Sequence, residues 1–245
     1  SEVSAGLEHR LLSNAEILHG VAGLFTSSVY VTRDEFQRYI KQLDLHSYNP
    51  GIQGVGYIQI IPATQKEQHV ATVRAEGFPD YTIRPPGKRD IYSSIIFIEP
   101  LNWRNKRALG YDVQTDPVRM QAASRARDEG EAAMTGKIIL QQETDKDVQA
   151  GVIIFSPIYQ IGMATSTVEQ RKKALRGWAY APIRIKDMLE NYLQLEYKDF
   201  SQKIAIRLYS GDTANGSDLI YDSYPTTPTN AFDNNDETII SFRLL

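Results

Sequence analysis

The sequence contains no cysteine among its 245 residues. This absence excludes disulfide bonds, thiolate nucleophiles and cysteine-ligated metals together. It also suits an oxidising compartment, in which a stray thiol would be a liability. No run of residues approaches the roughly 20 consecutive apolar residues that a membrane-spanning helix needs.

Positive charge is not in excess either. The formal net charge is −3, so the chain lacks the basic surface that marks nucleic-acid-binding proteins, and we expect no nucleic-acid partner. Hydrophobic residues make up 42% and charged residues 23% of the chain, which are ordinary values for a globular protein that buries a sizeable core.

Motifs for catalysis and metal binding are missing as well. The chain has no Gly-x-Ser-x-Gly elbow, no phosphate-binding loop and no dinucleotide-binding glycine motif. Its four histidines are scattered, and no two have the i, i+4 spacing of a helical zinc site. The acidic stretch 143–147 fails as a calcium loop, because Ala150 stands where glycine is required and Ser156 where a glutamate belongs. We therefore expect no catalytic residue, no metal and no cofactor, and predict that this chain is not an enzyme.

The first forty residues have the pattern of helices. A second helix starts at Thr32, with Glu35 completing a capping box. In the first helix, apolar residues alternate four and three apart, which is the spacing of a coiled-coil seam. Such a seam packs either on a second copy of the chain or on the rest of the same chain, and both alternatives stay open. Its members are Leu11, Ala15, Leu18, Ala22, Phe25 and Val29.

The rest of the chain alternates short strands with few helices. Because the strands cluster, the pattern predicts an α+β fold with antiparallel sheets rather than a parallel doubly wound fold. Strands followed by one helix occur twice, which indicates two modules after the N-terminal helices. The expected strands are 54–61, 81–84, 92–98, 138–140, 151–159, 177–183, 203–209, 218–223 and 237–242, and the expected helices are 64–76, 117–129 and 185–195.

One ordered series of short motifs resembles a known family. The series runs through Asp90-x-Tyr92, Ile95-Ile96-Phe97, Gly110-Tyr111-Asp112, the helix end at 125–130, and Gly151-Val152 with Pro157-Ile158-Tyr159. In this order the motifs are similar to those of the CHASE domain, the extracytoplasmic sensor of bacterial and plant receptor kinases, cyclases and phosphodiesterases. Each motif is short and unspecific by itself, and the order of the whole series carries the resemblance.

The resemblance implies a fold and a setting. The fold would be a long N-terminal helix within 1–48, a membrane-distal PAS-like module at 49–160 and a membrane-proximal PAS-like module at 161–245. The chain would be the periplasmic ligand-sensing part of an inner-membrane protein, held by flanking membrane segments. That protein would carry a cytoplasmic histidine kinase or a cyclic-dinucleotide cyclase or phosphodiesterase. Family members dimerise, so a homodimer through the N-terminal helix is expected.

The resemblance also implies a binding site in the distal module, where plant members bind cytokinins. Asp112 falls at the position of a carboxylate that holds an adenine-like ring; an ionised aspartate only accepts hydrogen bonds, so it would select N–H groups of such a ligand. A competing interpretation is that Asp112 caps the turn through Thr115 and Asp116. The other candidate ligand-binding residues are a hydroxyl, an apolar wall residue and two residues on flanking strands: Thr144, Met134, Phe97 and Ser156.

Two further hypotheses remain beside the small-molecule sensor. A protein–protein interaction ectodomain without a small-molecule ligand would have a shallow or filled pocket. An enzyme with an unfamiliar site would have a cluster of acidic residues with perturbed pKa values in a cleft.

Overall fold

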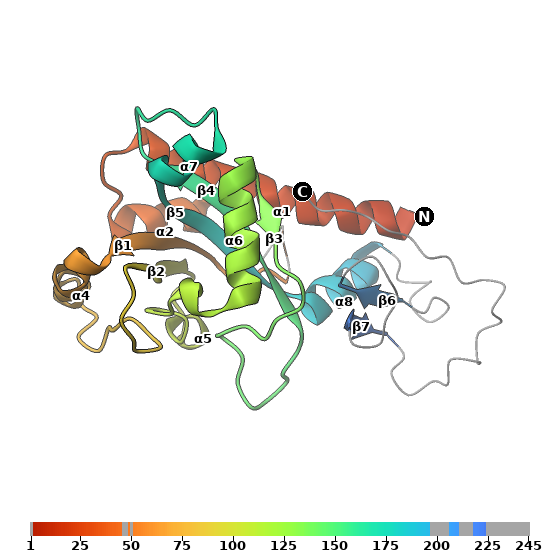
Figure 1. Ribbon diagram of the computed structural model, residues 1–245. Helices are drawn as coiled ribbons and strands as arrows, with labels where there is room; N and C mark the ends of the chain where they lie inside the picture. Colours follow the sequence, from red (N-terminus) through yellow and green to blue (C-terminus); the bar gives the residue numbers. More distant parts are fainter. Residues whose placement is uncertain (1, 46–48, 50, 197–205, 211–217, 224–245) are drawn as a thin grey trace, which may run out of the picture.

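The structure is a computed structural model that describes residues 2–45, 49, 51–196, 206–210 and 218–223. Figure 1 shows a long N-terminal helix lying along a twisted sheet, with further helices on both sides of that sheet. The strand expected at 237–242 and the start of the strand expected at 203–209 lie outside the described residues.

Two helices open the chain, α1 (Glu2–Ser27) and α2 (Arg33–Gln42). The capping box predicted at the start of α2 is confirmed. The Thr32 hydroxyl accepts the N–H of Glu35 at 3.2 Å, and the Glu35 carboxylate accepts the N–H of Thr32 at 2.8 Å. Because these bonds satisfy backbone donors that have no partner within the helix, they set where α2 begins.

A five-stranded antiparallel sheet forms the centre of the protein. Its spatial order is β2-β1-β5-β4-β3, so the last strand in sequence lies in the middle. This sheet confirms the α+β class with antiparallel pairing. The strands are β1 (Val55–Pro62), β2 (Ile91–Glu99), β3 (Ala133–Met134), β4 (Gly151–Tyr159) and β5 (Leu175–Arg184).

The central position of β5 corrects the boundary expected between residues 160 and 161. β5 pairs with β1 through Tyr57 and Ala179, and with β4 through Phe155 and Tyr180. The first sheet therefore contains a strand that the sequence assigned to the second module. The polar stretch after β4 is a connection that returns the chain through α7 (Val168–Ala174) to the same sheet, and it does not separate two modules.

The remaining elements are short. The segments 81–84 and 138–140, expected as strands, make only the isolated bridges Arg84–Tyr111 and Ile138–Gly151. Two strands that follow α8 pair with each other in a separate sheet. These elements are η1 (Ala63–Gln65), α4 (Lys66–Ala75), α5 (Trp103–Lys106), η2 (Val113–Thr115), α6 (Pro117–Glu129), α8 (Ile185–Glu196), β6 (Arg207–Tyr209) and β7 (Leu219–Asp222).

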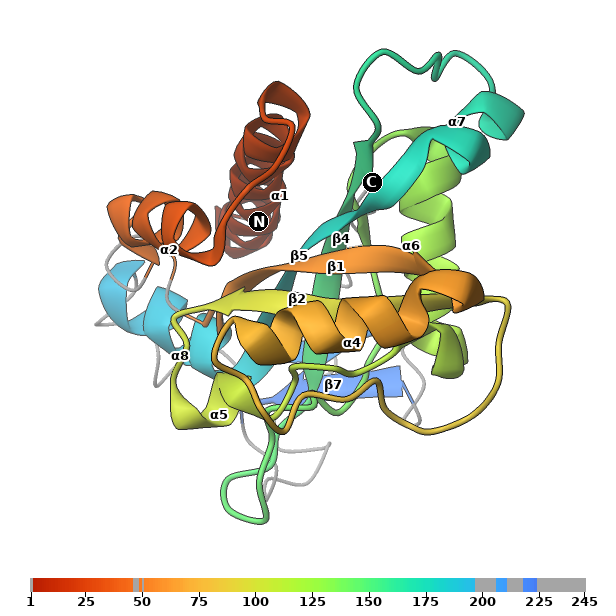
Figure 2. The same cartoon turned by 90° about the vertical axis from the view of Figure 1, so that its left-hand side faces the viewer.

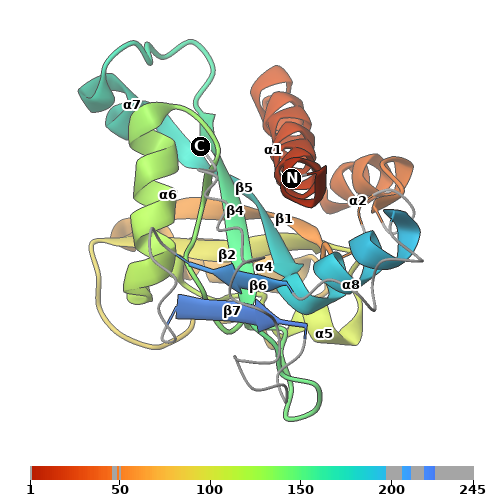
Figure 3. The same cartoon turned by 90° about the vertical axis from the view of Figure 1, so that its right-hand side faces the viewer.

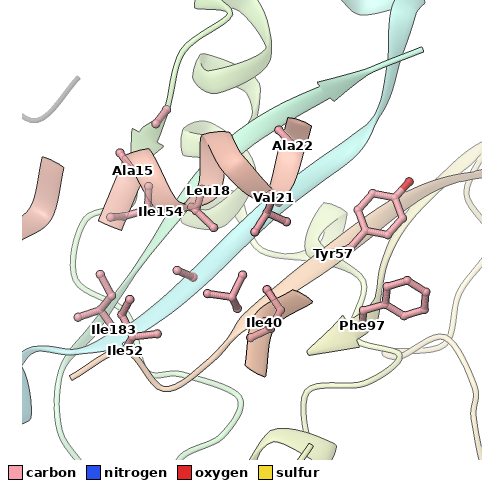
Figure 4. Close-up of a cluster of buried hydrophobic side chains, with 14 of the residues drawn as sticks. Ala15, Leu18, Val21, Ala22, Ile40, Ile52, Tyr57, Phe97, Ile154 and Ile183 are labelled. Atoms are coloured by element: carbon pink, nitrogen blue, oxygen red, sulfur yellow. The ribbon is translucent and has the colours of Figure 1, made fainter. Parts of the chain in front are cut away.

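The sheet is covered on both faces. Figure 3 shows α6 on one side of β4 and β5 and α1 on the other, and Figure 2 shows α4 near β1 and β2. On the α1 side, Leu18 and Val21 pack with strand residues such as Ile154 in one continuous apolar cluster (Figure 4). On the α6 side, a second cluster contains Trp178 and the alanines of α6.

The apolar seam of α1 packs within its own chain. Its residues from Leu11 to Phe25 are buried in the cluster that joins α1 to the sheet, whereas Val29, beyond the end of the helix, is 91% exposed. The structure thus shows the second of the two alternatives for the seam. A homodimer that used α1 would have to use the sides of the helix that the seam does not occupy.

Candidate functional site

A small cavity lies between the sheet and α6. The space that it offers to the centre of a water molecule is about 10 Å³, which is about enough for one water. A ring-sized ligand therefore fits only if part of the wall moves. Five strand residues and five residues from connections or α6 line the cavity: Ile58, Ile95, Ile153, Phe155, Tyr180, Tyr111, Val113, Arg119, Gln141 and Gln142.

Two polar groups of this lining have no hydrogen-bond partner in the protein. They are the hydroxyl of Tyr180 and the side-chain nitrogen of Gln142, and both atoms are fully buried. Burial raises the pKa of Tyr180 well above its usual value, so the hydroxyl keeps its proton and can donate it in a hydrogen bond. An unsatisfied buried polar group costs about 1–3 kcal/mol. The cavity is therefore suited to a molecule that offers acceptor atoms to these two donors.

Arg119 places a positive charge at the wall of the cavity. Its guanidinium pairs with Asp116, the N-cap residue of α6, and donates to the carbonyl of Ile139 at 2.7 Å. It also lies 5.2 Å from the centre of the Tyr111 ring. These contacts hold the side chain in place, so Arg119 shapes the wall between α6 and the segment after Ile138.

Asp112 is completely buried and has a structural role. Its Oδ1 accepts the N–H of Ser93 on the edge strand β2 at 2.9 Å and the N–H of Gln114 at 3.1 Å. The turn-capping interpretation is confirmed, although the capped N–H belongs to Gln114. Its Oδ2 accepts no hydrogen bond and lies 3.4 Å from the guanidinium of Arg89. The residues on either side of Asp112 line the cavity, and Asp112 itself does not.

Three of the other candidate residues lie on the opposite face of the sheet from the cavity. Phe97 belongs to an aromatic cluster on the α1 and α2 side, with its ring centre 5.2 Å from that of Phe36. Met134 packs against the same cluster. Ser156 is paired with Ala179, a member of that cluster, and its buried hydroxyl has no hydrogen-bond partner.

Thr144 stands in the connection before β4, two residues beyond Gln142. Its hydroxyl donates to the carbonyl of Lys146 at 3.2 Å, so it organises a local turn. The structure thus does not bring the five candidate residues together at one site. The cavity uses their neighbours in sequence, such as Ile95 near Phe97 and Phe155 beside Ser156.

None of the ten lining residues was among the five candidates named from the sequence, and the missed polar ones include Arg119, Gln142 and Tyr180. Tyr180 and Trp178 are two residues apart on an apolar strand, so the sequence indicates that they face the same side of a sheet. That strand, however, was assigned to the second module. Gln141-Gln142 directly follows the apolar residues 138–140. Two adjacent amide side chains at the end of an apolar segment were the sequence feature that could have indicated a polar wall.

A second hollow lies on the α2 side of the sheet and is larger, about 250 Å³. It is a surface groove between the start of α2 and the end of β2, lined in part by Arg33, Phe97 and Glu99. Arg33 is already bound to Glu76 at 2.6 Å and to the carbonyl of Ile96 at 2.6 Å. The remaining Nη2 atom of Arg33 is buried without a hydrogen-bond partner, but the groove is open on the surface. We therefore regard the smaller cavity, with two unsatisfied donors, as the better candidate site.

A chain of hydrogen-bonded side chains that starts at His69 lies next to Asp112. His69 contacts the Tyr81 hydroxyl at 3.0 Å, and that hydroxyl contacts Ser94 at 2.8 Å. Burial lowers the pKa of His69 to about 4, while Glu76 opposes the shift and Arg33 adds to it. An unfolded histidine titrates near pH 6.5, so between about pH 6.5 and 4 only the unfolded state takes up the proton.

We therefore expect this histidine to lower stability as the pH falls from about 6.5 to about 4, and to have no such effect above pH 6.5. The measurement is the free energy of unfolding of the wild type and of His69→Gln across this range. The wild type should lose more stability than the variant. Parallel loss in the two proteins would contradict the assignment.

Among the residues that the structure describes, no group of three or more His, Asp or Glu side chains is arranged to hold a metal ion. Within the same described ranges, no helix is both long and apolar enough to cross a membrane.

Comparison with known proteins identifies the family of this chain. No curated protein matches it. The CHASE domain family matches it over residues 29–221, which covers most of the chain and includes the sheet, the cavity and α8. The resemblance seen in the motifs is thereby confirmed: the chain belongs to the CHASE domain family, whose members are non-catalytic extracellular sensor domains of signalling proteins.

Proposed function

We propose that this chain is the periplasmic ligand-sensing part of a transmembrane signalling protein and binds a small molecule in the cavity between the sheet and α6. The observation that carries the proposal is the pair of buried donors, Tyr180 and Gln142, that have no acceptor in the protein. Flanking membrane segments would anchor the domain in the inner membrane. The cytoplasmic part would be a histidine kinase or a cyclic-dinucleotide enzyme.

The lining indicates the chemistry of the ligand. Apolar walls from Ile58, Ile95 and Phe155 favour an apolar ring, and the two free donors favour acceptor atoms on that ring. An adenine-like ring supplies both, because its nitrogens N3 and N7 are acceptors. Asp112 would then act indirectly, by holding Tyr111 and Val113 in the wall, rather than as the group that contacts the ligand.

Binding requires that the cavity grow. Gln141 and Gln142 belong to the connection between β3 and β4, which has no continuous strand pairing in 135–150. This part of the wall is the least constrained by backbone hydrogen bonds, so we propose that a ligand enters by displacing it.

Tyr180→Phe tests the site. We expect adenine and related ring compounds at 100 times Kd to stabilise the wild type by about 2.7 kcal/mol, which raises Tm by about 5–11 °C for a chain of this size. Tyr180→Phe removes one hydrogen bond to the ligand and should weaken binding about tenfold. The measurement is a thermal shift titration of both proteins.

Ser156→Ala is the matched control, because it also removes a buried hydroxyl without a partner but on the opposite face of the sheet. It should leave the titration unchanged. If Ser156→Ala weakens binding and Tyr180→Phe does not, the ligand lies on the α1 side and our assignment of the cavity is wrong.

The alternative is a protein–protein interaction ectodomain without a small-molecule ligand. The small volume of the cavity, about 10 Å³, favours it, because a pocket that serves no ligand is expected to be filled. Under this alternative no compound raises Tm. Tyr180→Phe then affects only the stability of the protein, by removing the cost of its unpaired buried hydroxyl. The homodimer through α1 also stays a prediction, on the sides of the helix away from its buried seam.

A further inference from the structure

Arg184 joins three carboxylates at the junction of β5 and α8. Its side chain is only 9% exposed, and its nitrogens lie 2.8 Å from Glu143, 3.1 Å from Asp147 and 2.5 Å from Asp187. Glu143 is the most buried of the three, with 3% of its side chain exposed. Since a buried carboxylate that loses its cation is strongly destabilised, Glu143 and Arg184 are expected to move as one unit.

The chain that carries Glu143 runs from the cavity to the start of α8. Gln142 lines the cavity, and Glu143 follows it directly. Six residues further on, the Gln149 amide donates to Asp187 at 2.9 Å, and its oxygen accepts the N–H of Asp187 at 3.2 Å. This side chain thereby satisfies one of the free N–H groups in the first turn of α8. The segment 142–149 thus holds both the cavity wall and the N-terminus of the helix.

α8 in turn packs on the first half of α1. Leu189 of α8 lies in the same buried cluster as Leu7 of α1. The guanidinium of Arg10 lies 5.0 Å from the centre of the Tyr192 ring. A Cβ atom at Gly6 would lie 1.8 Å from the Tyr192 hydroxyl, so a larger residue at position 6 would have to displace the Tyr192 side chain.

We infer that Glu143 and Arg184 are positioning residues that couple the cavity to α8 and, through α8, to the start of α1. An occupant that displaces Gln142 moves Glu143, the ion pair carries this displacement to Arg184, and the first turn of α8 shifts against α1. The inference rests on the proposed function for the cavity, but the coupling itself exists without a ligand. It can therefore be measured separately.

The test is hydrogen–deuterium exchange, read by mass spectrometry, on the wild type and Glu143→Gln without any added compound. We expect exchange to rise about tenfold in 141–150 and also in 185–192 and 5–11. A merely local role for Glu143 would raise exchange in 141–150 alone. Unchanged exchange in 185–192 would overturn the inference.

Two further variants complete the design. Glu169→Gln removes an exposed carboxylate that pairs with Lys172 at 3.1 Å, and it should match the wild type in all three segments. If Glu143→Gln unfolds the whole protein, Arg184→Lys keeps the charge but loses the planar fork, and it should show the same three segments with a smaller rise. Exchange confined to 141–150 in Arg184→Lys would contradict the coupling.

Compounds that raise Tm in the thermal shift titration allow a separate test, in which exchange is measured with the compound bound. Such a compound should change exchange in 185–192 of the wild type and have a several-fold smaller effect there in Glu143→Gln. An equal change in both proteins would overturn the coupling. If no compound raises Tm but Glu143→Gln still alters 185–192, the proposed function fails and the coupling stands.

Discussion

Replacing Trp178 by alanine is expected to lower the free energy of unfolding by about 3–5 kcal/mol. Trp178 is among the largest fully buried side chains of the described residues and lies on the α6 side of the central strand β5. Its indole N–H donates to the carbonyl of Ala123 at 2.9 Å. The substitution removes the contact of β5 with α6 and leaves a cavity between them, since the facing residues of α6 are small alanines. Urea denaturation followed by circular dichroism measures the loss.

The second tryptophan of the chain supplies the control. Trp103 lies in α5 and is 65% exposed, so Trp103→Ala should change stability by no more than about 0.5 kcal/mol. Trp178→Phe should fall between the two, because it keeps an aromatic ring but loses the hydrogen bond to the carbonyl of Ala123. A loss of less than about 1 kcal/mol for Trp178→Ala would show that α6 is not anchored through this residue.

Replacing Asp112 by alanine is expected to cost about 3 kcal/mol, because two backbone donors and one cation lose their partner. The N–H groups of Ser93 and Gln114 both donate to its Oδ1, and Arg89 lies 3.4 Å from its Oδ2. Without the carboxylate, one N–H at the outer edge of β2 and one at the start of η2 lose their hydrogen-bond acceptor. The measurement is again urea denaturation, at pH 7.

Asp112→Asn separates the contributions to this cost. An asparagine can still accept both N–H bonds through its carbonyl oxygen but loses the charge that faces Arg89, so we expect it to cost about 1 kcal/mol. If Asn and Ala cost the same, the pairing with Arg89 rather than the capping of β2 and η2 would be the main role of this side chain. If neither substitution alters stability, the structural role is wrong and a ligand contact becomes the better interpretation of this buried aspartate.

The helix caps and most of the strands were predictable, but the segments 81–84 and 138–140 form only isolated bridges and the assignment of faces was not predictable. The capping box at Thr32 and the stop at Gly130 follow from residues close in sequence, so the sequence pattern located them. Ser156 and Phe155 are adjacent, yet they point to opposite faces of the sheet because side chains alternate along a strand. A resemblance that places a motif to within one residue therefore cannot say which side chain faces the cavity.

Register irregularities make the assignment of faces harder still. The pairing of β1 with β2 shifts between Tyr57 and Ile58, and such a bulge changes which residues share a face. Ile95 and Phe97, two residues apart, would share a face of a regular strand, but they lie in the two separate clusters on opposite sides. Phe97 was therefore assigned to the flank of the pocket, whereas Ile95 lines the cavity.

The sequence by itself determined the family, the α+β class, the caps and the apolar seam of α1, because each depends on composition, on neighbouring residues or on helical spacing. What that seam packs against was decided only by the tertiary structure. Only the tertiary structure decided that β5 lies in the middle of the first sheet, that Asp112 binds backbone rather than lining the cavity, and that Arg184 joins the cavity wall to α8. Those features depend on contacts between residues far apart in the chain: Arg184 is 41 residues from Glu143 and Tyr57 is 122 residues from its partner Ala179. No local pattern specifies such pairs, since they form only when the strands assemble.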